Sequence, residues 1–111
     1  MQMEQAQRRE EDYIAVGASG DLKEEQMMVC VVKNQPVLII RNHHNLYAIS
    51  GVCSHAYSEL IDGELEGDKI YCSLHFACFD IRTGMPLEGP ANKPLRTFEV
   101  KEDEGKIWVR E

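Results

Sequence analysis

The sequence predicts an all-β domain, a small antiparallel sandwich or barrel. Short runs rich in Val, Ile and aromatic residues alternate with turns that contain Gly or Asn. No segment keeps an apolar period of 3.6 residues over more than two helical turns, so long helices are not expected. The chain has 111 residues, 43% of them hydrophobic, which is enough for one domain with its own core.

The first half of the chain is predicted to form a short strand followed by a three-stranded meander. Residues 1–12 are polar and charged and form a flexible tail, so the domain is expected to span 13–111. Tyr13–Val16 is the short strand, and residues 18–26 form a loop and a polar turn. The meander strands are Met27–Val32, Val37–Arg41 and Leu46–Ser50, joined by turns at residues 33–35 and 42–45.

The second half is predicted to contain two hairpins and a proline-bearing loop. An acidic, glycine-punctuated link runs over residues 60–68, and Lys69–Tyr71 is a short strand. Ala77–Ile81 is a further strand that ends in a tight turn at Thr83-Gly84, and residues 87–94 form a Pro/Gly loop. Thr97–Lys101 and Ile107–Arg110 form a closing hairpin.

Two mixed Cys/His pairs are the candidate metal ligands. Cys53-Ser54-His55 is followed, after sixteen residues, by Cys72-Ser73-Leu74-His75. Thiolates and imidazoles bind zinc, copper and iron–sulfur iron, but common zinc sites pair two cysteines on one arm. One Cys and one His on each arm suits a cluster in which one iron takes both thiolates and the other both imidazoles. We therefore predict one [2Fe–2S] cluster per chain, held by Cys53, His55, Cys72 and His75.

The spacing of these pairs resembles the Rieske pattern. Residues 79–84, Phe-Asp-Ile-Arg-Thr-Gly, resemble the hairpin that follows the second ligand loop in the Rieske family. Residues 87–91 resemble its third, proline-bearing loop, which covers the cluster, and 92–109 its closing strands. The likeness covers residues 13–111 and implies a cluster-binding region at about 51–91. Within the family the chain looks most like the small ferredoxins that feed electrons to ring-hydroxylating dioxygenases.

Departures from the high-potential members of the family imply a low reduction potential. Those proteins join the two ligand loops by a disulfide, and the matching positions here are Ser58 and Leu74. They also place Ser and Tyr hydroxyls against cluster sulfurs, where this chain has Ala77 and Phe79. Fewer hydrogen bonds to sulfur stabilise the reduced cluster less. The family also usually has Gly where this chain has Phe76.

The function that the resemblance implies is one-electron transfer from a flavin- or pyridine-nucleotide-linked reductase to a terminal oxygenase. The chain shows no catalytic base, nucleophile or substrate domain, so we expect a carrier and not an enzyme. Electrons are expected to leave through His55 and His75, inside an apolar collar of Tyr57, Leu74, Phe76 and Pro90. Two alternatives are a zinc-stabilised interaction module and an accessory or regulatory Rieske subunit of a reductase.

Charge and cysteine content restrict the partners and the compartment. A net charge of −7 and a pI of about 5.1 argue against nucleic acid and anionic membranes and suit a basic protein partner. The link from Glu59 to Asp68, with five carboxylates and no Lys or Arg, is the expected docking rim. Four cysteines without a visible signal peptide or membrane span favour the cytoplasm, and we expect a monomer. Cys30, Cys78 and Trp108 are expected in the core, and His43 and His44 in solvent.

Overall fold

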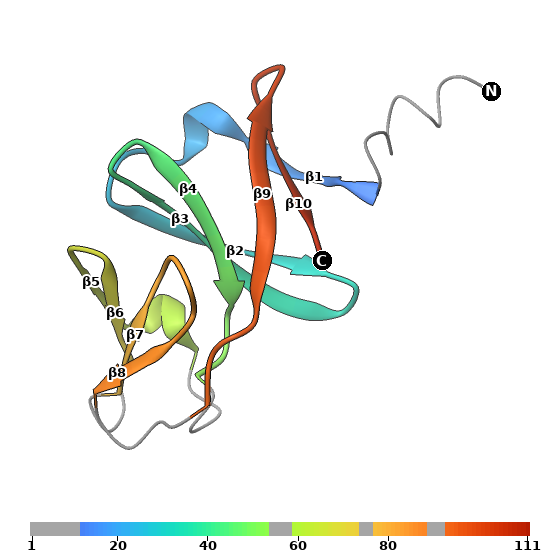
Figure 1. Ribbon diagram of the computed structural model, residues 1–111. Coiled ribbons are helices and arrows are strands. Elements are labelled where there is room, and N and C mark those ends of the chain that lie inside the picture. Colours follow the sequence, from blue (N-terminus) through green and yellow to red (C-terminus); the bar gives the residue numbers. More distant parts are fainter. Residues whose placement is uncertain (1–11, 54–58, 74–76, 89–92) are drawn as a thin grey trace.

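The computed structural model describes residues 12–53, 59–73, 77–88 and 93–111. These residues form two antiparallel sheets, a six-stranded one and a four-stranded one, which lie side by side (Figure 1). The all-β prediction is confirmed. Within the described part of the chain, no helix has the length and hydropathy needed to span a membrane.

The six-stranded sheet is a nearly closed barrel. Its strands, in spatial order, are β1 (Ile14–Ala18), β10 (Lys106–Arg110), β9 (Thr97–Asp103), β4 (Asn45–Ser50), β3 (Gln35–Asn42) and β2 (Gln26–Val32). The two edge strands approach each other, because a Cβ added at Gly17 of β1 would lie 3.0 Å from Cε of Met28 in β2. A short 3-10 helix, η1 (Ser19–Asp21), connects them. The predicted meander is β2–β3–β4, and the predicted closing hairpin is β9–β10.

The four-stranded sheet contains the second predicted ligand arm. Its strands, in order, are β5 (Glu64–Glu66), β6 (Lys69–Tyr71), β7 (Cys78–Asp80) and β8 (Pro86–Glu88), preceded by the 3-10 helix η2 (Leu60–Asp62). The sequence predicted β6 to the residue but placed β5 inside a link and the last two residues of β8 inside a loop. We call this four-stranded sheet the small sheet.

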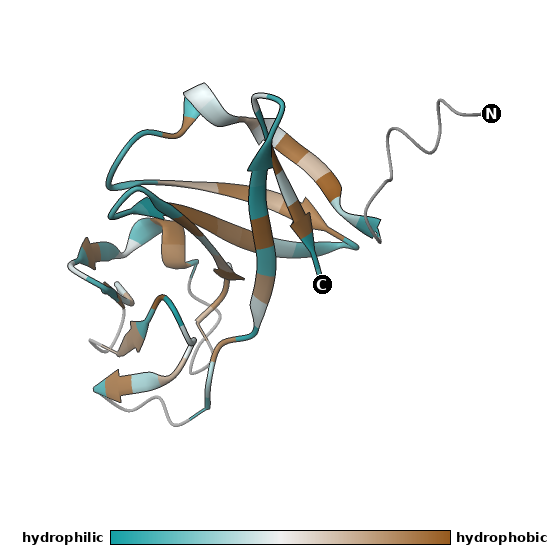
Figure 2. Ribbon diagram, turned by 45° about the horizontal axis from the view of Figure 1, so that its top comes forward, coloured by the Kyte–Doolittle hydropathy of each residue, from teal (hydrophilic) through white to brown (hydrophobic). Residues whose placement is uncertain are grey.

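Two hydrophobic cores share strand β3. Val37 and Ile39 face the barrel interior with Phe98, whereas Leu38 and Ile40 belong to a second core with Phe79 of the small sheet. All four β3 side chains are fully buried. Side chains alternate between the faces of a strand, so β3 presents one apolar face to each core. In Figure 2 the barrel strands carry hydrophobic stretches while the hairpin turns are hydrophilic.

Arg41 of β3 fastens the connection between β1 and β2 to the barrel. Its Nε donates to the Leu22 carbonyl at 2.6 Å, and its guanidinium forms a forked pair with Glu102 of β9, at 3.2 and 2.6 Å. The hydrogen bond from Arg41 lowers the pKa of the Glu102 carboxyl. Leu22 is 3% exposed and packs in the barrel core, so the prediction of a polar turn from residue 22 was wrong at this residue.

Candidate metal centre

The first arm leaves the barrel directly from β4. Cys53 lies three residues beyond Ser50, the last residue of β4. The segment between them is fixed by backbone bonds, since Gly51 N–H donates to the Pro36 carbonyl and Leu60 N–H to the Gly51 carbonyl, each at 2.9 Å. These bonds hold the arm close to the β2–β3 hairpin and to η2, so Cys53 is positioned by barrel strands.

The second arm is a hairpin of the small sheet. β6 delivers Cys72, whose N–H donates to the Ala77 carbonyl at 2.7 Å where the chain returns into β7. Gly63 allows the chain before β5 to pass against β6, because a Cβ there would lie 2.0 Å from the Tyr71 carbonyl oxygen. The sequence therefore builds the second arm from tightly paired short strands.

The structure brings the two predicted thiolate ligands into one core. Cys53 and Cys72 are each 3% exposed, neither is in a disulfide, and both belong to the core between the sheets. His55 and His75, and the predicted collar residues, lie outside the described residues. Two reduced thiols, delivered by separate arms into apolar surroundings, are the donors that an iron–sulfur cluster requires. The described residues therefore fit a [2Fe–2S] cluster.

The residues predicted to replace the hydroxyl donors of the high-potential members share a buried core with these thiols. Ala77 and Phe79 are fully buried and lie in the same core as Cys53 and Cys72. Neither side chain carries a hydrogen-bond donor. Phe79 therefore contributes packing to this core, as does Ile70, its partner across β6 and β7.

The remaining two cysteines, Cys78 and Cys30, are buried and half-buried. Cys78 is fully buried and pairs across the sheet with Tyr71, whose hydroxyl hydrogen-bonds with the thiol. Burial raises the pKa of the Cys78 thiol, so its reactive thiolate is disfavoured. Cys30 is half-buried and packs against the barrel core. Trp108 is 4% exposed, and its indole N–H donates to the Asp103 carbonyl at 3.1 Å.

The acidic link lies on the small sheet. Glu64 and Glu66 are exposed at both ends of β5, and Leu65 between them packs against the core. Glu59 and Asp62 are also exposed, whereas Asp68 is half-buried in the β5–β6 turn. Alternation along β5 thus puts both of its carboxylates on the outer face. His43 was predicted in solvent, and its side chain is 62% exposed, with Nε2 at 3.4 Å from an Asp68 oxygen.

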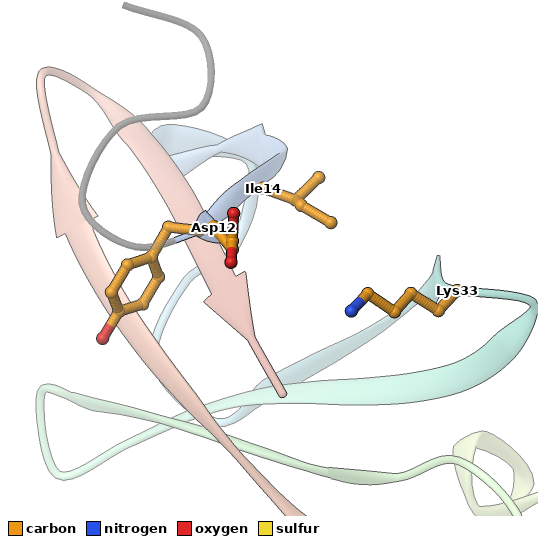
Figure 3. Close-up of a pocket in the computed structure, with 4 residues that line it drawn as sticks. Asp12, Ile14 and Lys33 are labelled. Carbon is orange, nitrogen blue, oxygen red and sulfur yellow. The ribbon is translucent and has the colours of Figure 1, made fainter. Parts of the chain in front are cut away.

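The hollows on the described surface differ in whether they contain a predicted ligand. One, of about 340 Å³, is lined by Asp62, Gly63, Glu64, Tyr71, Cys72 and Ser73. A predicted ligand and residues of the acidic link therefore line the same hollow. Another, of about 310 Å³, lies between the start of β1 and the β2–β3 turn, where Ile14 and Lys33 point toward each other (Figure 3). The second hollow contains none of the predicted ligands.

Known proteins share both the sequence pattern and the fold. Residues 12–99 match the family described as the Rieske [2Fe-2S] domain. The ferredoxin component of biphenyl 2,3-dioxygenase from Rhodococcus jostii (strain RHA1) is 40% identical over 92 residues, or 83% of this chain and 86% of that protein.

Solved ferredoxin structures extend the match over nearly the whole chain. The ferredoxin of carbazole 1,9a-dioxygenase from Nocardioides aromaticivorans IC177 has a TM-score of 0.84 at 33% identity, covering 88% of this chain and 96% of that one. A chain in the complex of reduced oxygenase and oxidized ferredoxin in carbazole 1,9a-dioxygenase has a TM-score of 0.82, also at 33% identity, covering 88% and 92%. The chain therefore belongs to the Rieske [2Fe-2S] family and is an electron-carrying ferredoxin with one [2Fe–2S] cluster, like the ferredoxin components of aromatic-ring dioxygenase systems.

Proposed function

We propose that this ferredoxin accepts one electron from a flavin-dependent reductase and passes it to a terminal oxygenase that acts on aromatic rings. The observation that carries the proposal is the similarity over nearly the whole chain to ferredoxins of such systems, one of them solved together with its oxygenase. The chain spans 86% of one such relative's length.

We assign the cluster ligands to Cys53, His55, Cys72 and His75, within a domain of residues 13–111 and a cluster-binding region at about 51–91. The cluster supplies the redox change, and the protein's part is to hold it at the end of two rigid arms. Burial of Cys53 and Cys72 supports this assignment, because it keeps water from the thiolates. Ala77 and Phe79 offer no donor to the cluster sulfurs, which supports a low reduction potential.

We place reductase docking on the acidic link, from Glu59 to Asp68. The exposure of Glu64 and Glu66 beside the Cys72 arm supports this placement. A basic reductase face would be attracted to these carboxylates over a distance set by the ionic strength. We further assign the protein to the cytoplasm, where cysteines outside disulfides are usual, and we expect a monomer.

Spectroscopy and reconstitution test the proposal. Purified protein should contain about two irons and two acid-labile sulfides per chain, and a rhombic electron paramagnetic resonance signal should appear only on reduction. Added in catalytic amounts, it should couple NADH oxidation by a dioxygenase-system reductase to aromatic-ring oxidation by the matching oxygenase. One zinc per chain without sulfide would favour the zinc-stabilised module. A normal cluster that the reductase reduces but no oxygenase oxidises would favour the accessory subunit.

A further inference from the structure

Asn42, the last residue of β3, is a buried polar side chain that the sequence did not single out. It is 2% exposed, and it is the only polar or charged residue among the described ones that is buried to this degree. A buried amide costs free energy unless its N–H groups find acceptors. The partners of this amide therefore show what it does.

The Asn42 amide joins the barrel to the small sheet. Its Nδ2 lies 2.7 Å from the Gly67 carbonyl oxygen and 3.3 Å from an Asp68 carboxylate oxygen. Gly67 and Asp68 are the two turn residues between β5 and β6. One side chain at the end of a barrel strand thus binds both residues of a turn in the other sheet.

The β5–β6 turn transmits this contact to the second ligand arm. β6 begins directly after Asp68 and ends at Tyr71, one residue before Cys72. The Asp68 carbonyl also accepts the N–H of Ile81 at 2.9 Å, directly after β7. Both strands of the arm are therefore tied to the turn that Asn42 holds.

The two arms depend on different sheets for their position. Cys53 follows β4 of the barrel, whereas Cys72 follows β6 of the small sheet. The apolar core between the two sheets holds the sheets together. Hydrophobic contact is non-directional, however, so it permits one sheet to slide on the other. A buried hydrogen bond has a preferred length and angle, so it can fix how the sheets are set against each other.

Other polar contacts at this turn are exposed. His43 Nε2 lies 3.4 Å from Asp68, and Arg82 Nη1 lies 3.9 Å from it, but these His and Arg side chains are 62% and 54% exposed. Exposed ion pairs contribute little to stability because water and salt screen them. The buried amide is therefore the stronger directional link.

We propose that Asn42 is a positioning residue, whose amide sets the small sheet on the barrel and so fixes the Cys72 arm relative to the Cys53 arm. This inference rests on the proposed ligand assignment. In electron transfer, a cluster held by two arms in one fixed arrangement reorganises little between oxidation states. Asn42 would contribute to that rigidity without touching the cluster.

The test compares Asn42→Asp with Asn45→Asp in the cluster-loaded protein. Asn45 is the cross-strand partner of Asn42 in the same hairpin but is exposed, so its variant matches the change in charge. Asn42→Asp sets a carboxylate against the Gly67 carbonyl and the Asp68 carboxylate. Hydrogen exchange of the Ile81 amide should then become about tenfold faster, while the Val109 amide of the barrel should not change. The resonance signal of the reduced cluster should also broaden.

A rescue and a second variant complete the test. Asn42→Asp combined with Asp68→Asn exchanges donor and acceptor and should return Ile81 exchange toward the wild-type rate. If Asn42→Asp does not fold, Asn42→Leu removes the amide without adding charge and should change the same two readouts in the same direction. Equal Ile81 exchange and equal line width in the folded Asn42 variant and in Asn45→Asp would overturn the inference. Failure of the ligand assignment would be distinct, because Cys72→Ala or His55→Ala would then leave the cluster spectrum unchanged.

Discussion

Replacing Glu64 and Glu66 together by Gln should slow association with the reductase in a salt-dependent way. Both carboxylates are exposed on β5. At about 10 Å in water, a pair of opposite unit charges interacts by about 0.4 kcal/mol before screening. Screening lengths of about 30 Å at 0.01 M salt and about 8 Å at 0.15 M reduce this to about 0.3 and about 0.1 kcal/mol.

The double variant should therefore associate about threefold more slowly at 0.01 M salt and about 1.5-fold more slowly at 0.15 M. With five carboxylates, the wild-type rate constant should itself fall about fivefold between these salt concentrations. Stopped-flow reduction by a flavin-dependent reductase of a dioxygenase system measures both quantities. Electron transfer within the docked pair should change little, because neither carboxylate lies among the proposed ligands.

The control is Asp21→Asn with Glu104→Gln, which changes the net charge from −7 to −5, as the test pair does. Asp21 in η1 and Glu104 in the β9–β10 turn lie at the end of the barrel away from the small sheet (Figure 1). The control should alter the rate much less than the test pair. Equal effects of the two pairs, or a flat salt profile for the wild type, would refute docking at the acidic link.

Three further predictions concern the cluster and the barrel. Cys72→Ala and His55→Ala should each lose the visible absorption and the resonance signal, and an unchanged spectrum from either would contradict the ligand assignment. The midpoint potential should lie near about −150 mV, and Ala77→Ser should raise it if its hydroxyl reaches a sulfur; a wild-type value well above zero in protein-film voltammetry would contradict this. Because Arg41 lowers the pKa of Glu102, the pair stabilises the fold above the unfolded pKa of about 4.3, and this stability is lost as pH falls through the folded pKa. Glu102→Gln should therefore lower the urea midpoint more at pH 7 than near pH 3.5, and equal losses would show that the pair does not contribute.

The sequence predicted the strands whose residues favour strand structure by themselves. β6, Lys69–Tyr71, was predicted to the residue, and the meander was predicted within two residues at each end. β5 was not predicted because Glu64 and Glu66 have low strand propensity, and only pairing with β6 makes them a strand. β8 was not predicted because it begins at Pro86. Proline is tolerated at the first position of a strand, but in a sequence it usually indicates a loop.

The candidate site was predictable as far as local spacing determines it. The two Cys/His pairs predict the ligands because both members of each pair lie within four residues. Asn42 was assigned to a turn, and its contact with Gly67 spans 25 residues. No local sequence pattern predicts a hydrogen bond between residues so far apart, because the geometry of that bond depends on how the two sheets pack. The burial of Leu22 between polar neighbours was missed for the same reason.

The two-sided burial of β3 limits how this ferredoxin can be recombined with its relatives. A chimera that takes residues 51–95 from another ferredoxin would bring a new small sheet against Leu38 and Ile40, which belong to the recipient's barrel. A graft that also moves these two side chains keeps their contacts, but Val37 and Ile39 must still match the recipient's barrel interior. The useful unit of exchange is therefore the small sheet together with alternate residues of one barrel strand, a unit that is discontinuous in the sequence.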